Sequence, residues 1–216
     1  MRPAAAGLAL ALGGPALLAL TSDRLFTGWG AVAQSLFGQL VLWLLVCAVV
    51  AITLRWERQP LASLGIRPFR AASVLWGLAA AAALVYAVVP LASGVVAALG
   101  LAGFEAGLST VLAWPLWLRV LAVLTGGLAE ELLYRGYAIT RLEPLTRSGT
   151  LAAALSVLIF ALAHGPLWGP GPVVSFLFSG GFLAAFFLWR RDLLANVVAH
   201  ITVDALGLVF GLAASE

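Results

Sequence analysis

The chain has 216 residues, of which 63% are hydrophobic and only 10% are charged. Soluble globular proteins average about 45–50% apolar and about 25% charged residues, because their surfaces face water. The composition therefore excludes an ordinary soluble enzyme, a nucleic-acid-binding protein and a disordered protein. It predicts an integral membrane protein whose surroundings are membrane lipid.

Seven apolar runs predict the segments that cross the membrane. A helix needs about 20 residues to cross the hydrocarbon core of a bilayer, and the runs lack the alternation of a β-barrel. Their approximate bounds are 4–21, 31–54, 72–98, 111–141, 150–164, 173–189 and 193–213. The fifth run is short, and Pro90 leaves open a division of the third into two spans. We expect an all-α, polytopic membrane helix bundle of about seven transmembrane helices, within a range of six to eight.

The arginines indicate the orientation of these spans, because positively charged loops stay in the cytoplasm. All twelve basic residues are arginine. With seven spans and a cytoplasmic N-terminus, Arg24 falls outside and nine arginines fall inside. The nine are Arg2, Arg55, Arg58, Arg67, Arg70, Arg141, Arg147, Arg190 and Arg191. The lysine-free, Ala-, Leu- and Gly-rich composition is typical of a GC-rich bacterial proteome, so we expect a bacterial inner membrane protein. The first run could be a cleaved signal peptide, but because six further apolar runs follow it we expect it to be retained as a span.

Ionisable residues inside membrane spans are costly unless they are paired or lie in a wet cavity, so they are candidate functional residues. Glu131 and Arg135 stand four residues apart on one helix face, in the order that favours an ion pair. The neighbouring Glu130 points to another side of the helix and cannot share that arginine equally. It is either a hydrogen-bonded structural acid or a reactive carboxylate. Arg119 is interpreted as an anchor at the membrane interface.

Two later runs carry further polar groups. Asn196, His200 and Asp204 follow one another at steps of four and form one polar stripe on an apolar helix. Such a stripe faces the bundle interior or a cavity, where it serves either interhelical hydrogen bonds or chemistry. His164 ends the fifth run, four residues after Phe160. The unassigned glutamate and the two histidines fall at overlapping depths, which predicts a polar catalytic cavity in the C-terminal half of the chain.

Three short motifs in the same region resemble the signatures of a known family. They are Glu130-Glu131-x-x-x-Arg135, Phe160-x-x-x-His164 and His200-x-x-x-Asp204. Each is weak alone, but their order resembles the CPBP family of CAAX proteases and bacteriocin-processing enzymes, also called the type II CAAX prenyl protease or Abi family. The resemblance covers about residues 111–213. It implies N-terminal transmembrane helices over 1–110 and a CPBP-like catalytic helix core over 111–216, within one membrane domain.

The resemblance implies an intramembrane glutamic endopeptidase, a peptide hydrolase. By motif position, Glu130 would activate water, His164 would help to hold that water, and His200 and Asp204 would stabilise the oxyanion. The supporting residues would be Glu131, Arg135, Asn196 and Phe160. An ionised Asp204 beside an oxyanion would be repulsive, so we interpret it as the residue that orients His200. Asn196 would then supply an amide to the reacting centre.

The residues leave three alternatives open. Zinc bound by Glu130, His164 and His200 is one, although the resemblance points to catalysis without a metal or other cofactor. A transporter with a proton relay is the second, and no internal repeat supports it. The third is a non-catalytic scaffold or immunity protein that keeps the fold and has lost the chemistry.

The substrate expected of a protease here is a membrane-associated peptide or the cytoplasmic end of another membrane protein. Nothing in the sequence indicates whether that substrate is prenylated. Because the layer of polar groups is expected nearer the arginine-rich face, we predict access from the cytoplasm or laterally between helices.

Overall fold

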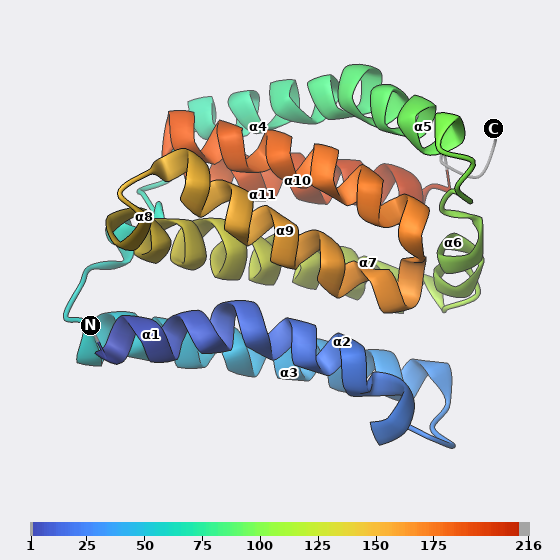
Figure 1. Ribbon diagram of the computed structural model, residues 1–216, viewed down its shortest axis with the longest axis horizontal. Coiled ribbons are helices and arrows are strands. Elements are labelled where there is room, and N and C mark those ends of the chain that lie inside the picture. Colours follow the sequence, from blue (N-terminus) through green and yellow to red (C-terminus); the bar gives the residue numbers. More distant parts are fainter. Residues whose placement is uncertain (1, 212–216) are drawn as a thin grey trace.

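The computed structural model describes residues 2–211, which form a bundle of long helices (Figure 1). Apart from the short 3₁₀ helix η3, the elements labelled η are π-helical stretches. Most continue a neighbouring α-helix without a break, as in α1–η1–α2, α4–η4–α5 and α7–η5–α8. In chain order the helices are α1 (Arg2–Leu8), η1 (Ala9–Gly13), α2 (Gly14–Leu25), α3 (Ala31–Ala51), η2 (Ile52–Trp56), η3 (Leu61–Leu64), α4 (Ala71–Ala83), η4 (Leu84–Val88), α5 (Val89–Ala98), α6 (Glu105–Leu112), α7 (Leu116–Thr125), η5 (Gly126–Ile139), α8 (Thr140–Thr146), α9 (Gly149–Trp168), α10 (Pro170–Arg190), α11 (Leu193–Asp204) and η6 (Ala205–Val209).

The predicted all-α membrane bundle is confirmed. Within the described residues, five helices are long and apolar enough to cross a membrane. The shorter apolar helix over Leu193–Val209 and the charged rod α7–η5–α8 complete the bundle. Each of the seven predicted apolar runs corresponds to one of these rods.

Prolines set the helix boundaries differently from the prediction. Pro90 does not divide the third run, because the π-helical turn η4 stands just before it and makes room for its ring. Pro115 does break the fourth run: the short α6 ends before it, and α7 begins at the next residue. The fifth run is not short, since α9 continues through Pro166 to Trp168 and reaches 20 residues. The rod that carries Glu130 therefore spans residues 116–146 rather than 111–141.

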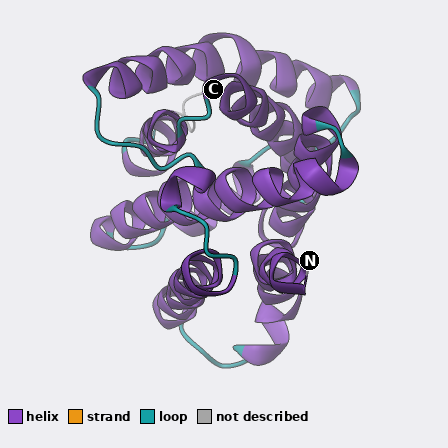
Figure 2. Cartoon of the chain, turned by 90° about the vertical axis from the view of Figure 1, so that its left-hand side faces the viewer, coloured by secondary structure: helices purple, strands orange, loops and turns teal. Residues whose placement is uncertain are grey.

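The antiparallel rods give the bundle two distinct ends. One end, called here the arginine-rich end, carries the start of α1, residues 57–70, the α8–α9 turn and the α10–α11 turn (Figure 1). The other end carries residues 26–30, α6 and the α9–α10 turn. Figure 2 looks at the arginine-rich end and shows the rods of α1–α3 together on one side of the bundle.

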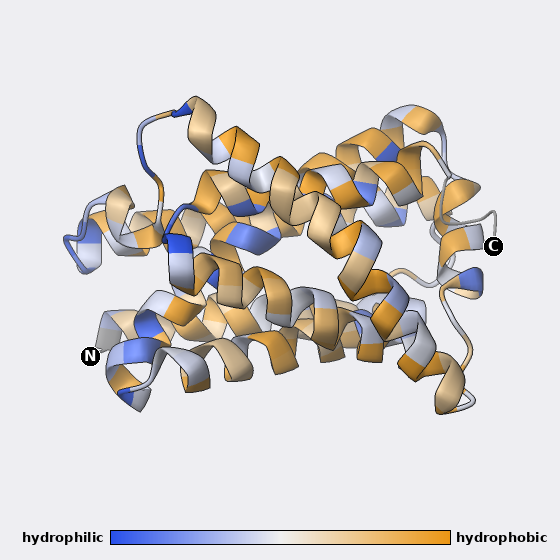
Figure 3. Cartoon of the chain, turned by 90° about the horizontal axis from the view of Figure 1, so that it is seen from above, coloured by the Kyte–Doolittle hydropathy of each residue, from blue (hydrophilic) through white to orange (hydrophobic). Residues whose placement is uncertain are grey.

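Polar contacts hold the arginine-rich end together. Glu57 accepts hydrogen bonds from Arg141 Nε at 2.8 Å and from the hydroxyl of Tyr137 at 2.7 Å. Arg191 donates to Glu143 at 2.8 Å, which joins the end of α10 to α8. In Figure 3 the loops at this end are hydrophilic, whereas most of the length of the rods is apolar. The segregation is the one that a bilayer requires.

Candidate active site

The two adjacent glutamates of η5 face different surroundings. The side chain of Glu130 is 17% exposed and lines a cavity of about 360 Å³, whereas that of Glu131 is 0% exposed. Consecutive residues of a helix point in clearly different directions, so one helix supplies both positions. The pair belongs to a π-helical segment of 14 residues, and π-helical winding, although rare, is frequent at functional sites.

Glu131 is the centre of a buried polar cluster. Its Oε1 atom lies 3.0 Å from Arg135 NH1 and 2.9 Å from His200 Nδ1. Its Oε2 atom accepts a hydrogen bond of 3.2 Å from the Asn196 amide. The predicted ion pair with Arg135 is present, and the cluster ties α11 to η5. A buried carboxylate needs such partners, because an unpaired charge in this environment is strongly destabilising.

His200 lies between the buried cluster and the cavity carboxylate. While its Nδ1 atom contacts Glu131, its Nε2 atom lies 3.3 Å from Asp204 Oδ2 and 3.9 Å from Glu130 Oε2. Asp204 is one helical turn after His200, and its carboxylate lies beside the imidazole ring. The structure thus brings together four of the predicted site residues from two helices.

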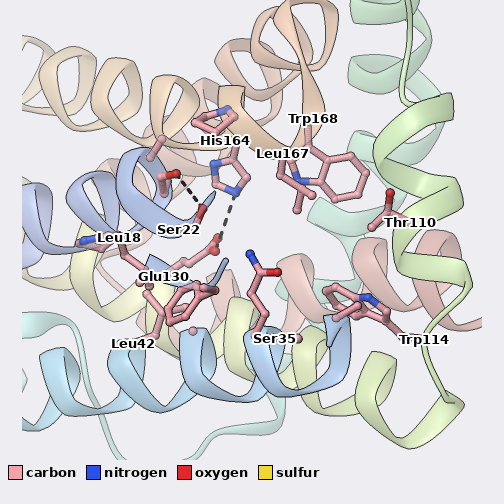
Figure 4. Close-up of a pocket in the computed structure, with 18 of the residues that line it drawn as sticks. Leu18, Ser22, Ser35, Leu42, Thr110, Trp114, Glu130, His164, Leu167 and Trp168 are labelled. Carbon is pink, nitrogen blue, oxygen red and sulfur yellow. Dashed lines mark hydrogen bonds and ion pairs between the residues drawn. The ribbon is translucent and has the colours of Figure 1, made fainter. Parts of the chain in front are cut away.

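His164 approaches the same carboxylate from α9. Its Nδ1 atom lies 2.7 Å from the carbonyl oxygen of Phe160, an acceptor, so Nδ1 carries a proton and Nε2 faces Glu130 Oε1 at 3.8 Å (Figure 4). The rings of Phe160 and Phe176 pack against the imidazole. At 3.8 and 3.9 Å, neither histidine makes a direct hydrogen bond to Glu130. The carboxylate therefore has lone pairs free for a water molecule in the cavity.

Two predicted supporting residues lie behind the site. Arg135 packs over the ring of Phe160, with the guanidinium carbon 4.5 Å from the ring centroid, and donates to the Gly180 carbonyl at 3.3 Å. Asn196 is fully buried, and its amide nitrogen donates to Glu131 and, at 2.8 Å, to the Leu183 carbonyl. The interpretation that Asn196 supplies an amide to the reacting centre is therefore wrong, because both its donor hydrogens are used inside the protein.

Arg119 joins α7 to the last described helix. Its guanidinium donates a hydrogen bond of 3.2 Å to the carbonyl oxygen of Leu208, near the end of η6. Its role as an anchor at the membrane interface stays a prediction. Its Nε atom is buried without a hydrogen-bond partner among the described residues.

The N-terminal rods α1–η1–α2 and α3 also line the cavity (Figure 4). Ser22 of α2 and Ser35 of α3 lie there, together with Gln34. From the sequence no function was assigned to these residues, although Gln34 and Ser35 are polar side chains inside the second apolar run, a signal that could have found them. The full lining is Pro15, Leu18, Ala19, Ser22, Phe26, Ala31, Gln34, Ser35, Gly38, Leu42, Thr110, Trp114, Glu130, Tyr134, Ala163, His164, Pro166, Leu167 and Trp168.

The cavity runs from Glu130 toward the end of the bundle opposite the arginines. Thr110, Trp114 and Trp168, which line it, belong to α6, the α6–α7 turn and the end of α9. The cavity therefore does not lead to the arginine-rich end, from which one of the two predicted access routes would start, whereas lateral access between helices stays a prediction. The reason is the helix boundary at Pro115, which places Glu130 near the middle of its rod rather than close to the arginine-rich end.

The motif region of the chain matches a known protein family. Residues 112–206 match the model of the family described as type II CAAX prenyl endopeptidase, Rce1-like. The match contains all three predicted motifs and confirms the resemblance to CAAX proteases over this region. Comparisons with curated proteins and with solved structures gave no match.

Proposed function

We propose that the chain, whose residues 112–206 match the model of the Rce1-like family of type II CAAX prenyl endopeptidases, is a glutamate-dependent intramembrane endopeptidase. The observation that carries the proposal is the Glu130 carboxylate, which lines a cavity between two imidazoles without a direct hydrogen bond to either. A carboxylate so placed is a suitable general base for water.

In the proposed reaction Glu130 acts first as a general base and then as a general acid. Glu130 takes a proton from a water molecule that His164 helps to orient, and the resulting hydroxide attacks the scissile carbonyl carbon. Carboxylates flank both nitrogens of His200, so its ring is proposed to be the imidazolium, which stabilises the oxyanion. Glu130 then gives its proton to the leaving amine, the peptide bond breaks, and a new N-terminus and a new carboxyl group are released.

Asp204 is proposed to keep His200 in position, and its variant tests that role. Asp204→Asn is expected to lower kcat on the order of 10²-fold, because an amide no longer holds the charge and orientation of the imidazole. The thermal midpoint of unfolding should stay near that of the unchanged chain, since Asp204 lies at the edge of the buried cluster. Full activity in this variant would show that His200 needs no such partner.

Catalysis is proposed to need no metal. Among the described residues, no group of three His, Cys, Asp or Glu side chains is arranged to hold a metal ion. Dialysis against a strong chelator should therefore leave the rate of peptide cleavage unchanged. A loss of activity that added zinc restores would overturn this part of the proposal.

We propose a bacterial inner membrane location with the arginine-rich end in the cytoplasm, so that the cavity faces the opposite side. Labelling of single cysteines tests this, with Cys47, the chain's one cysteine, first changed to Ala. Ala106→Cys on α6 should react with an impermeant maleimide in intact cells, whereas Gln59→Cys should react only after permeabilisation. The reverse pattern would place the cavity toward the cytoplasm.

The substrate proposed is a membrane-associated peptide or membrane protein, and mapping of new protein N-termini in host membranes tests the function itself. Cells carrying the chain are compared with cells carrying Glu130→Gln at equal abundance. Termini that disappear in the variant would establish a protease and identify its substrates. Identical sets of termini, repeated under several growth conditions, would contradict the proposal and favour transport or a scaffold.

A further inference from the structure

Tyr134 lines the cavity, and its buried hydroxyl group has no hydrogen-bond partner among the described residues. The residue is 1% exposed. Buried polar groups in folded proteins are nearly always hydrogen-bonded, so an unpaired hydroxyl calls for an explanation.

Packing fixes the position of this hydroxyl. The Tyr134 ring stands edge-on against Phe160 with ring centroids 5.1 Å apart, and its backbone oxygen accepts a hydrogen bond of 2.7 Å from Ser156. Tyr134 lies four positions after Glu130, so the two side chains share a side of η5.

A second tyrosine of the same helix shows what a structural role looks like. Tyr137 lies three residues further along η5, and its hydroxyl donates to Glu57 at 2.7 Å, at the arginine-rich end and away from the cavity. That bond joins two helices. The hydroxyl of Tyr134 joins nothing in the described structure, so phenylalanine would serve its packing equally well.

In the proposed reaction His200 is the one donor assigned to the oxyanion. Its Nε2 atom also lies 3.3 Å from Asp204 Oδ2, and the Asn196 amide is turned inward. An oxyanion of peptide hydrolysis is normally stabilised by more than one donor placed in advance.

We propose that the Tyr134 hydroxyl is a further catalytic residue, which donates a hydrogen bond to the oxygen of the scissile carbonyl and to the oxyanion that forms there. The inference rests on the proposed protease function. The hydroxyl gains its partner when the peptide occupies the cavity, and it keeps its proton throughout, so the reaction needs no additional acid or base.

The test compares Tyr134→Phe with Tyr137→Phe in the purified, full-length chain, with a peptide found by N-terminal mapping as substrate. Tyr134→Phe should lower kcat about 10²-fold, the loss typical of one oxyanion donor, with little change in KM. Its thermal midpoint should be unchanged or higher, because the variant removes an unpaired buried hydroxyl. Tyr137→Phe should lower the thermal midpoint and leave kcat unchanged at temperatures well below unfolding.

Three results would overturn the inference. The first is full kcat in Tyr134→Phe, and the second is a fall in activity that tracks a fall in its thermal midpoint. Both leave the protease function intact if cleavage by the unchanged chain is lost in Glu130→Gln. The third is the absence of Glu130-dependent cleavage by the unchanged chain, which would overturn the protease function together with this inference.

Discussion

Replacement of Glu130 by Gln should abolish peptide cleavage and leave the fold intact. The amide has the shape of the carboxylate but cannot take a proton from water, so we expect kcat to fall about 10³-fold or more. Stability should not change, because within the described residues Glu130 makes no hydrogen bond and its nearest ionisable partners are 3.8 and 3.9 Å away. Cleavage of a defined peptide by purified protein, alongside thermal unfolding, measures both effects.

Glu105→Gln provides a matched control for Glu130→Gln. Glu105 begins α6 and is exposed at the same end of the bundle as the cavity, so this change removes the same charge without altering the site. It should retain normal kcat. Activity in Glu130→Gln close to that of the control would refute the role of Glu130 as base.

Replacement of the next residue, Glu131, should have the opposite result: a large loss of stability. Glu131→Ala removes the acceptor of Arg135, His200 and Asn196 and leaves a buried guanidinium without its counter-charge. Breaking a buried ion pair in this way costs roughly 3–5 kcal/mol of the free energy of unfolding. Denaturant-induced unfolding in detergent, followed by circular dichroism, measures it.

A double variant separates the free energy of the Glu131–Arg135 ion pair from the general effect of removing the Glu131 side chain. Glu131→Ala combined with Arg135→Met removes both charges and should recover part of the lost stability, because no unpaired charge stays buried. If Glu131→Ala alone had native stability, the buried cluster would not hold η5 to α11. Any loss of activity in Glu131→Ala should accompany its loss of folding, in contrast to Glu130→Gln.

The polar pairs that lie along one helix could be predicted from the sequence. The contacts of Glu131 with Arg135 and of His200 with Asp204 follow from a spacing of four residues, whatever the rest of the fold does. Spacing also separates Glu130 from Glu131, because neighbouring helical residues cannot face the same way. These are local properties of a helix.

Contacts between helices could not be predicted in the same way. Asn196 belongs to the polar stripe of α11, yet its amide turns to Leu183 and Glu131 and not to the cavity. Nothing in the sequence marked Tyr134 as a site residue, since an aromatic residue in an apolar run ordinarily belongs to the hydrophobic core. The wall formed by Ser22 and Ser35 lies outside the family match and has no motif.

The sequence by itself determined that this protein is an all-α membrane bundle with a buried ion pair and a glutamate set apart from it. Those conclusions depend on the hydrocarbon thickness of the bilayer and on the period of the helix, which act on each segment separately. Only the tertiary structure decided which side chains meet around Glu130, which rods enclose the cavity, and toward which end it runs. The rotation and axial position of each helix depend on its packing against the others, and a short break such as that at Pro115 shifts a whole rod along its axis.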